Sequence, residues 1–240
     1  MYQSLEELCQ LEHETKKPFW KMVQEDDCRE RGVSEEQAYE EMRGMYLAMQ
    51  SADQEYDAKQ KAASGLVGTE GDKMRAAREK GTLLCGNFIG KVMEKALKIS
   101  ESNACMKRIV AAPTAGACDV LPAVLIPCYH RFDCPESRIL EALYTSAGIG
   151  QVIAYRASIA GASGGCQAEI GSASSMAAGA MGAVAAADMA LAGIRSNIPA
   201  DQVFDAMREV GDKMDASLRE TGFGGLAATP EGNRLRDRLS

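Results

Sequence analysis

The amino-acid sequence predicts a mostly α-helical protein built as a single domain. Apolar residues recur at helical spacing along most of its 240 residues. Aromatic residues make up only 5% of the chain, whereas glycine (23 residues) and methionine (13 residues) are frequent. Because β-sandwiches usually need more aromatic and β-branched side chains, this composition favours helices that pack closely through small residues.

Residues 1–60 predict two or three amphipathic helices. Ser4 and Ser34 each begin a capping box, in which the serine and a Glu or Gln three residues later satisfy free N–H groups at a helix start. Methionines recur at helical spacing over residues 39–56, with charged residues between them. We interpret this stripe as core packing rather than as a binding surface.

A glycine-broken segment at residues 59–72 interrupts the helical pattern. Ser64 and Gly65 are followed by two further glycines, which predicts a loop. Such a loop can present backbone N–H groups to an anion, or it can be a plain linker. We divide the chain here into an N-terminal helical segment, 1–63, and a larger helical part, 64–240, which together form one compact unit.

The next stretch predicts a helix over residues 73–100 and a short strand at 109–112. Pro113 excludes its predecessor from helical geometry, and Gly116 permits unusual backbone angles. The sequence therefore predicts a sharp turn that leads into a helix over residues 121–129. Free N–H groups at the start of such a helix favour a carboxylate.

The C-terminal half predicts further helices. One begins at residues 133–136, and an amphipathic helix over 200–220 precedes a glycine-broken tail at 221–232. Between them, residues 173–194 are nearly all small or apolar. Asp188 and the weak insertion energies of Ala and Gly argue against a membrane span, so we predict a buried central helix.

Charge and cysteine content limit the possible partners. The net charge of −7 argues against nucleic acid as the main partner. The first residues lack the apolar segment of an export signal, so we expect a cytoplasmic protein with reduced thiols. Eight cysteines are present without a C-x-x-C pair, which argues against a zinc ribbon or a redox dithiol. Most should be buried and structural, and one or two could bind metal.

The segment 161–171 is the strongest local indication of a site. Cys166 and Glu169 are one helical turn apart and are flanked by glycines, which allow close approach of the backbone to a cofactor. A tight helix–loop crossing with a buried cysteine is the alternative. The two histidines are weaker candidates, because His13 belongs to a polar helix and His130 to a helix C-terminus, where an imidazolium is stabilising.

Four separated segments together resemble the α chain of the iron–sulfur-dependent L-serine dehydratase. In chain order they read Ser-Gly-Leu-Val-Gly (64–68), Ala-Ala-Pro-Thr-Ala-Gly (111–116), Gly-Ala-Ser-Gly-Gly-Cys-Gln-Ala-Glu-Ile-Gly (161–171) and Gly-Phe-Gly-Gly-Leu-Ala-Ala-Thr-Pro (222–230). The resemblance covers nearly the whole chain. It implies a helical catalytic domain with glycine-rich active-site loops that deaminates L-serine to pyruvate and ammonia.

In this family, three cysteine thiolates hold an oxygen-sensitive 4Fe-4S cluster, whose open iron polarises the substrate hydroxyl. A base removes the Cα proton, water leaves, and the resulting enamine becomes an imine that hydrolyses. The resemblance implies that Cys166 is the first cluster ligand and leaves the base unassigned. It implies L-serine as ligand and a β chain or a second copy of the chain as partner. The residues that it assigns to substrate binding are Ser64, Gly65, Pro113, Thr114, Gly116, Ser163 and Gln167.

The chain departs from the family pattern after its small-residue helix. The family continues there with a few dozen residues that contain Cys-Asp-Pro-Val-x-Gly-Leu-Val-x-Val-Pro-Cys, which resemble the second and third cluster ligands. Here residues 176–180 lead directly to 181–189, and no cysteine follows Cys166. Cys118 is the nearest substitute. Two hypotheses follow: an L-serine dehydratase α chain in a shortened form, or a non-catalytic scaffold or partner-binding relative.

Overall fold

The computed structural model describes residues 2–191 and 198–239, with side chains for 2–181 and 198–238. Within these ranges the chain is mostly α-helical, as the sequence predicts, and short 3-10 helices (η) join some of the elements. The elements are α1 (Leu5–Thr15), α2 (Phe19–Arg31), α3 (Glu35–Gln54), α4 (Glu70–Glu79), α5 (Gly86–Ala104), η1 (Ala115–Ala117), α6 (Val120–Phe132), α7 (Glu136–Arg156), α8 (Gly161–Leu191), α9 (Ala200–Asp212), η2 (Ala216–Leu218), η3 (Gly225–Ala228) and α10 (Pro230–Leu239).

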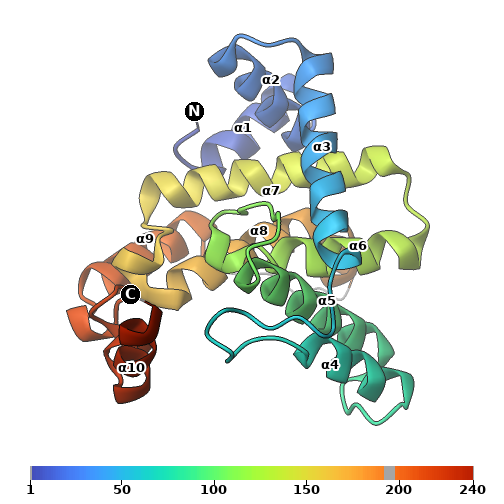
Figure 1. Ribbon diagram of the computed structural model, residues 1–240. Helices are drawn as coiled ribbons and strands as arrows, with labels where there is room; N and C mark the ends of the chain where they lie inside the picture. Colours follow the sequence, from blue (N-terminus) through green and yellow to red (C-terminus); the bar gives the residue numbers. More distant parts are fainter. Residues whose placement is uncertain (1, 192–197, 240) are drawn as a thin grey trace.

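Helix α7 crosses the centre of the molecule, with α1 and α2 on one side, and α3 runs across it toward α6 (Figure 1). It packs against α2, α3, α8 and α9. The main core lies between α3, α6, α7 and α8. Its buried residues are Tyr46, Met49, Ala112, Leu121, Leu125, Ile126, Ile139, Leu140, Leu143, Met176 and Ala177. A second cluster joins α1, α2, α7 and α9 and consists of Leu8, Met22, Val152, Ile153 and Phe204.

The N-terminal region confirms the prediction of helices with serine caps. Three helices occupy residues 5–54, and the hydroxyls of Ser4 and Ser34 accept backbone N–H groups at the starts of α1 and α3. The methionine stripe of α3 is only partly core, because Met49 is buried while the side chain of Met45 is 45% exposed. Helices α5, α6 and α7 therefore cover only part of the methionine-bearing face of α3.

Three sequence predictions of local structure are wrong in detail. The helix expected over 73–100 is two helices, α4 and α5, because Gly81 and Gly86 adopt left-handed backbone angles between them. Residues 109–112 form no strand, since helices rather than a second extended segment surround them. The helix expected over 200–220 ends at Asp212, and the chain then turns back toward α8.

Helix α8 confirms a small-residue helix as far as Leu191, but the prediction of complete burial is wrong for residues 173–181, whereas the side chains of 182–191 and all of 192–194 lie outside the described residues. Ala173 and Met176 are buried, whereas Ser174 and Ala178 on the opposite face are exposed. The helix is kinked at Gly165, whose φ of 68° and ψ of −177° are not helical. In the part of the chain that the structure describes, no helix is both long enough and apolar enough to cross a membrane.

Small residues bring α7 and α8 close together. A side chain at Gly150 would lie 2.8 Å from the sulfur of Met176, and one at Gly179 would overlap the end of the Ile149 side chain. The Ser146 hydroxyl donates across the interface to the carbonyl of Met176, over 3.1 Å. These contacts pack α8 closely against α7, and the candidate site lies at the start of α8.

Candidate functional site

The first turns of α8 meet the turn that precedes α6. An ideal Cβ at Gly116 would lie 2.5 Å from Oε2 of Glu169, and one at Gly161 would lie 2.9 Å from the same oxygen. The Glu169 carboxylate therefore occupies the space that side chains at both positions would need. Two of the segments that carry the family resemblance, 111–116 and 161–171, are thus in direct contact.

Cys166 begins the part of α8 that follows the kink at Gly165. Its exposed thiol donates to Oε2 of Glu220, over 3.2 Å, and the backbone N–H of Glu220 donates to the carbonyl of Gly161, over 3.1 Å. The hydrogen bond to Glu220, together with partial burial and the charge of Glu169, raises the pKa of the Cys166 thiol. The neutral thiol is therefore favoured, whereas a metal ligand must be a thiolate.

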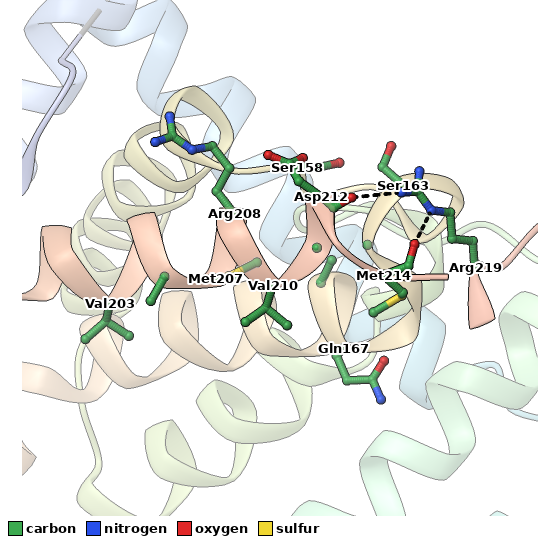
Figure 2. Close-up of a pocket in the computed structure, with 14 residues that line it drawn as sticks. Ser158, Ser163, Gln167, Val203, Met207, Arg208, Val210, Asp212, Met214 and Arg219 are labelled. Carbon is green, nitrogen blue, oxygen red and sulfur yellow. Dashed lines mark hydrogen bonds between the residues drawn. The ribbon is translucent and has the colours of Figure 1, made fainter. Parts of the chain in front are cut away.

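A cavity of about 360 Å³ lies between the start of α8 and α9 (Figure 2). Ser163 and Gln167, both predicted substrate residues, line it. On α9 the lining combines the apolar side chains of Val203, Met207 and Val210 with the charged residues Arg208 and Asp212. The cavity thus has a mixed apolar and polar lining, which is typical of sites for small molecules.

Arg219 supplies a cation to the edge of this cavity. Its Nε donates to the carbonyl of Met214, over 3.2 Å, and one terminal nitrogen donates to the carbonyl of Asp212, over 3.4 Å (Figure 2). A guanidinium has five N–H groups, so these two bonds orient Arg219 and leave donors for a carboxylate. The sequence alone does not predict a role for Arg219 or Glu220, because these residues reach α8 only where the chain turns back after α9.

The other predicted substrate residues lie in two loops. The peptide bond between Ala112 and Pro113 is cis, and the hydroxyl oxygen of Thr114 is buried without a hydrogen-bond partner among the described residues. Ser64 and Gly65 lie at the tip of the loop between α3 and α4. Their hydrogen bonds stay within that loop: the Ser64 hydroxyl accepts from Leu66, and Gly65 donates to the carbonyl of residue 62.

The histidines are where the sequence places them. His13 is exposed on α1, and His130 lies in the last turn of α6, with its ring 5.3 Å from that of Tyr129. Neither residue is among those that line the cavity or contact Cys166. Both therefore remain structural residues of their helices.

The cysteines do not form a cluster site. The expectation that most are buried is wrong: only Cys118 and Cys128 are buried, because the others lie near helix ends or on exposed faces. Cys118 packs with Ala52 and Ile99, and burial raises the pKa of its thiol to about 12. All eight cysteines lie within the described residues, where no three His, Cys, Asp or Glu side chains form a group that could hold a metal ion.

A 4Fe-4S cluster is held by several cysteine thiolates. At the start of α8, Cys166 is the thiol present, and it is hydrogen-bonded to a carboxylate. Cys118, which is buried, packs in an apolar cluster. The residues present therefore do not fit such a cluster.

Comparison with known proteins identifies the family. The family profile described as "Serine dehydratase alpha chain" matches residues 14–185 and 178–227. The probable L-serine dehydratase α chain of Bacillus subtilis is 37% identical over 223 residues, covering 73% of this chain and 74% of that protein. The L-serine dehydratase α chain of Peptoniphilus asaccharolyticus is 38% identical over 203 residues, covering 65% and 70%. The probable α chain of Latilactobacillus sakei is 35% identical over 194 residues, covering 61% and 93%.

These matches contain a gap on the side of this chain. The alignment with the Bacillus protein extends over 223 residues, whereas 73% of 240 residues is about 175, so about 48 positions of that relative face no residue here. The two stretches matched by the family profile meet at residues 178–185. The match nevertheless extends over most of the sequence, so the chain belongs to the serine dehydratase α chain family.

Proposed function

We propose that this chain is an L-serine-binding α chain of L-serine dehydratase type, a carbon–nitrogen lyase by family, whose own residues do not suffice to hold the cluster. The observation that carries the proposal is the surroundings of Cys166. The predicted substrate residues Ser163 and Gln167 flank it on α8, and Glu169, three residues later, lies against the turn at Gly116. The hydrogen-bond partner of Cys166 is Glu220 rather than a second metal ligand. Substrate recognition and iron ligation are therefore separated in this chain.

L-Serine is a small zwitterion, and the site offers a partner for each of its charged groups. Arg219 has free donors for the carboxylate, and Ser163 and Gln167 add neutral hydrogen-bonding groups to the lining of the cavity. Asp212, which also lines the cavity, provides an acceptor for the ammonium group. A volume of about 360 Å³ is ample for one serine molecule with water.

Several observations support the absence of the remaining cluster ligands. About 48 positions of the Bacillus relative face no residue of this chain, and no cysteine follows Cys166, which supports the proposal that the family's later cysteine-containing stretch is missing here. One thiolate cannot retain a four-iron cluster, because metal binding requires the full set of deprotonated ligands. Any dehydration of serine then requires ligands from a partner, and we propose a β chain as that partner.

The second candidate function is a non-catalytic relative that binds a partner chain. The hydrogen bond between Cys166 and Glu220 favours this alternative, because it stabilises the neutral thiol. The eight free cysteines fit a reducing, cytoplasmic setting under either function. Serine binding distinguishes the two functions, since only the first requires it.

Two measurements on the purified chain test the proposal. The first is titration calorimetry with L-serine and, as the matched control, D-serine, in wild type and in Arg219→Ala. We expect binding of the L isomer, weakened at least tenfold by the substitution. The second is anaerobic reconstitution with iron and sulfide, followed by iron counting and assay of pyruvate formation; we expect neither a stoichiometric cluster nor pyruvate.

Each result has a definite meaning. A four-iron cluster with serine-dependent pyruvate in the chain alone would refute the claim that its residues are insufficient. Absence of L-serine binding in a protein that is helical by circular dichroism would refute the substrate proposal and leave the non-catalytic alternative. Addition of a β chain that restores both cluster and pyruvate would support the partner proposal.

A further inference from the structure

We propose that Glu101, a buried residue of α5, is a positioning residue for the loop of residues 57–69, which carries Ser64 and Gly65. The inference rests on the proposed function only in taking this loop as a serine-facing loop. The contacts that fix the loop are independent of that function. They begin at the start of α4, where the loop ends.

Helix α4 has no N-terminal cap of its own. Thr69, at the cap position, adopts left-handed backbone angles with a φ of 82°, and its side chain makes no capping hydrogen bond. The first N–H groups of a helix need partners from elsewhere when such a cap is missing. Oε1 of Glu101 accepts two of them, from Glu70 over 2.8 Å and from Gly71 over 3.1 Å. The next N–H, of Asp72, donates to the Tyr56 hydroxyl over 3.3 Å.

Glu70 extends these contacts from the start of α4 into the loop. Its Oε2 accepts the backbone N–H of Gly68, over 2.9 Å, so the carboxylate of Glu70 closes the last turn of the loop. The chain from Glu101 through Glu70 to Gly68 thus connects the buried face of α5 with the loop.

The loop itself is closed tightly enough to transmit this restraint. The N–H of Ala62 donates to the carbonyl of Val67 over 2.9 Å, which brackets Ser64 and Gly65. A Cβ at Gly68 would lie 2.5 Å from the carbonyl oxygen of Gln60, so the two ends of the loop cross in contact. A shift at Gly68 would therefore move the tip.

Glu101 is built into the fold more deeply than a helix cap requires. Its side chain is only 3% exposed, and Oε2 is buried without a hydrogen-bond partner among the described residues. A buried carboxyl oxygen without a partner is unfavourable. The two N–H groups and the ordered loop offset that cost. A capping serine at position 69 would satisfy the helix without linking the loop to α5.

The test compares Glu101→Leu, Glu101→Gln and Ser102→Ala. Leucine removes the acceptor, whereas glutamine keeps a carbonyl oxygen in place of Oε1. Ser102 is the matched control, because it is adjacent on α5, is 2% exposed, and its hydroxyl donates to the carbonyl of Ala52 on α3 rather than to an acceptor in the loop. For each variant we would measure the melting temperature, amide hydrogen exchange at Gly68, Glu70 and Gly71, and the dissociation constant for L-serine.

We expect Glu101→Leu to raise the exchange rates of the three amides at least tenfold and to weaken L-serine binding at least tenfold. Glu101→Gln should restore both values to within about threefold of wild type. Ser102→Ala should lower the melting temperature while leaving both values unchanged. Rescue by glutamine separates positioning from a general loss of stability.

Two results would overturn the inference. Unchanged amide exchange in Glu101→Leu would show that Glu101 does not hold the loop. Faster amide exchange with unchanged serine affinity would show that the loop held by Glu101 does not contribute to serine binding. If wild type itself bound no serine, the proposed function would fail, and the exchange data would still decide whether Glu101 anchors the loop.

Discussion

Replacement of Glu94 by alanine tests how α4 is held against α5. The Glu94 side chain is only 6% exposed and receives two cations: Nε of Arg78 donates to Oε2 over 2.8 Å, and Nζ of Lys98 donates to Oε1 over 2.6 Å. The side chains of Arg78 and Lys98 are 18% and 13% exposed. The substitution Glu94→Ala would leave both cations partly buried, close together and without their shared carboxylate.

The expected loss of stability in Glu94→Ala follows from the burial and contacts of these side chains. Removing one partner of a buried ion pair costs about 3–5 kcal/mol. Arg78 would keep Asn87, at 3.2 Å, and Lys98 would keep the ring of Tyr56, at 5.8 Å, so we expect the lower end, about 3 kcal/mol. For a protein of this size, that loss corresponds to a fall of about 6–12 °C in melting temperature.

Urea denaturation monitored by circular dichroism measures the change, with Glu79→Ala as the control. Glu79 contacts Arg78 at 3.6 Å, but its side chain is 60% exposed, so its loss should cost less than about 1 kcal/mol. A loss below about 1 kcal/mol in Glu94→Ala, or one equal to that of the control, would refute the assignment of Glu94 as a buried link between the helices.

The difference in stability between wild type and Glu94→Ala should also depend on pH. Burial raises the pKa of Glu94, but the hydrogen bonds from Lys98 and Arg78 outweigh it, so the pKa in the folded state is lowered. A carboxylate with a depressed pKa stabilises the fold above its unfolded pKa, about 4.3, and this contribution is lost as pH falls through the folded value. The difference in stability between wild type and Glu94→Ala should therefore persist at neutral pH and shrink below about pH 4.

Two further substitutions test the packing of α7. Gly148→Ala should lower the free energy of unfolding by about 1–2 kcal/mol, because the new Cβ would lie 2.5 Å from Cγ2 of Val23. Gly44→Ala is the control: it has open space around it, so it should be neutral or stabilising in the same urea titration. Ser146→Ala should cost about 1 kcal/mol, since it removes the hydroxyl that donates to the carbonyl of Met176; an unchanged thermal midpoint would contradict that role.

Local signals explain which parts of the fold the sequence predicts well. The serine caps of α1 and α3 and the inward residues of α7, such as Leu140 and Leu143, depend on neighbours within a turn or two. The break between α4 and α5 depends instead on left-handed angles at Gly81 and Gly86. Glycine permits those angles without requiring them, so the sequence alone does not determine the break.

The sequence likewise predicts only some residues of the candidate site. Gly116 and Cys166 belong to motifs that could be recognised in the sequence, and the structure places Cys166 in the first turns of α8 and Gly116 against Glu169 of the same helix. Glu220 and Arg219 follow α9 in the chain and reach α8 only because the segment after Asp212 turns back. A contact between Cys166 and a residue 54 positions later leaves no periodic trace in the sequence.

The residues that hold α8 in the fold differ from those that would hold iron. Its buried face repeats at helical spacing through Ala173, Met176 and Ala177, and partly buried Ala180 continues it against the main core. The helical backbone then continues across the junction between Ala180 and Met181, in the region where the two stretches matched by the family profile meet. None of the residues of this buried face is a predicted iron ligand. Loss of iron ligation should leave the helical fold and its denaturation midpoint intact, which is why binding of serine and binding of iron can be measured separately in this chain.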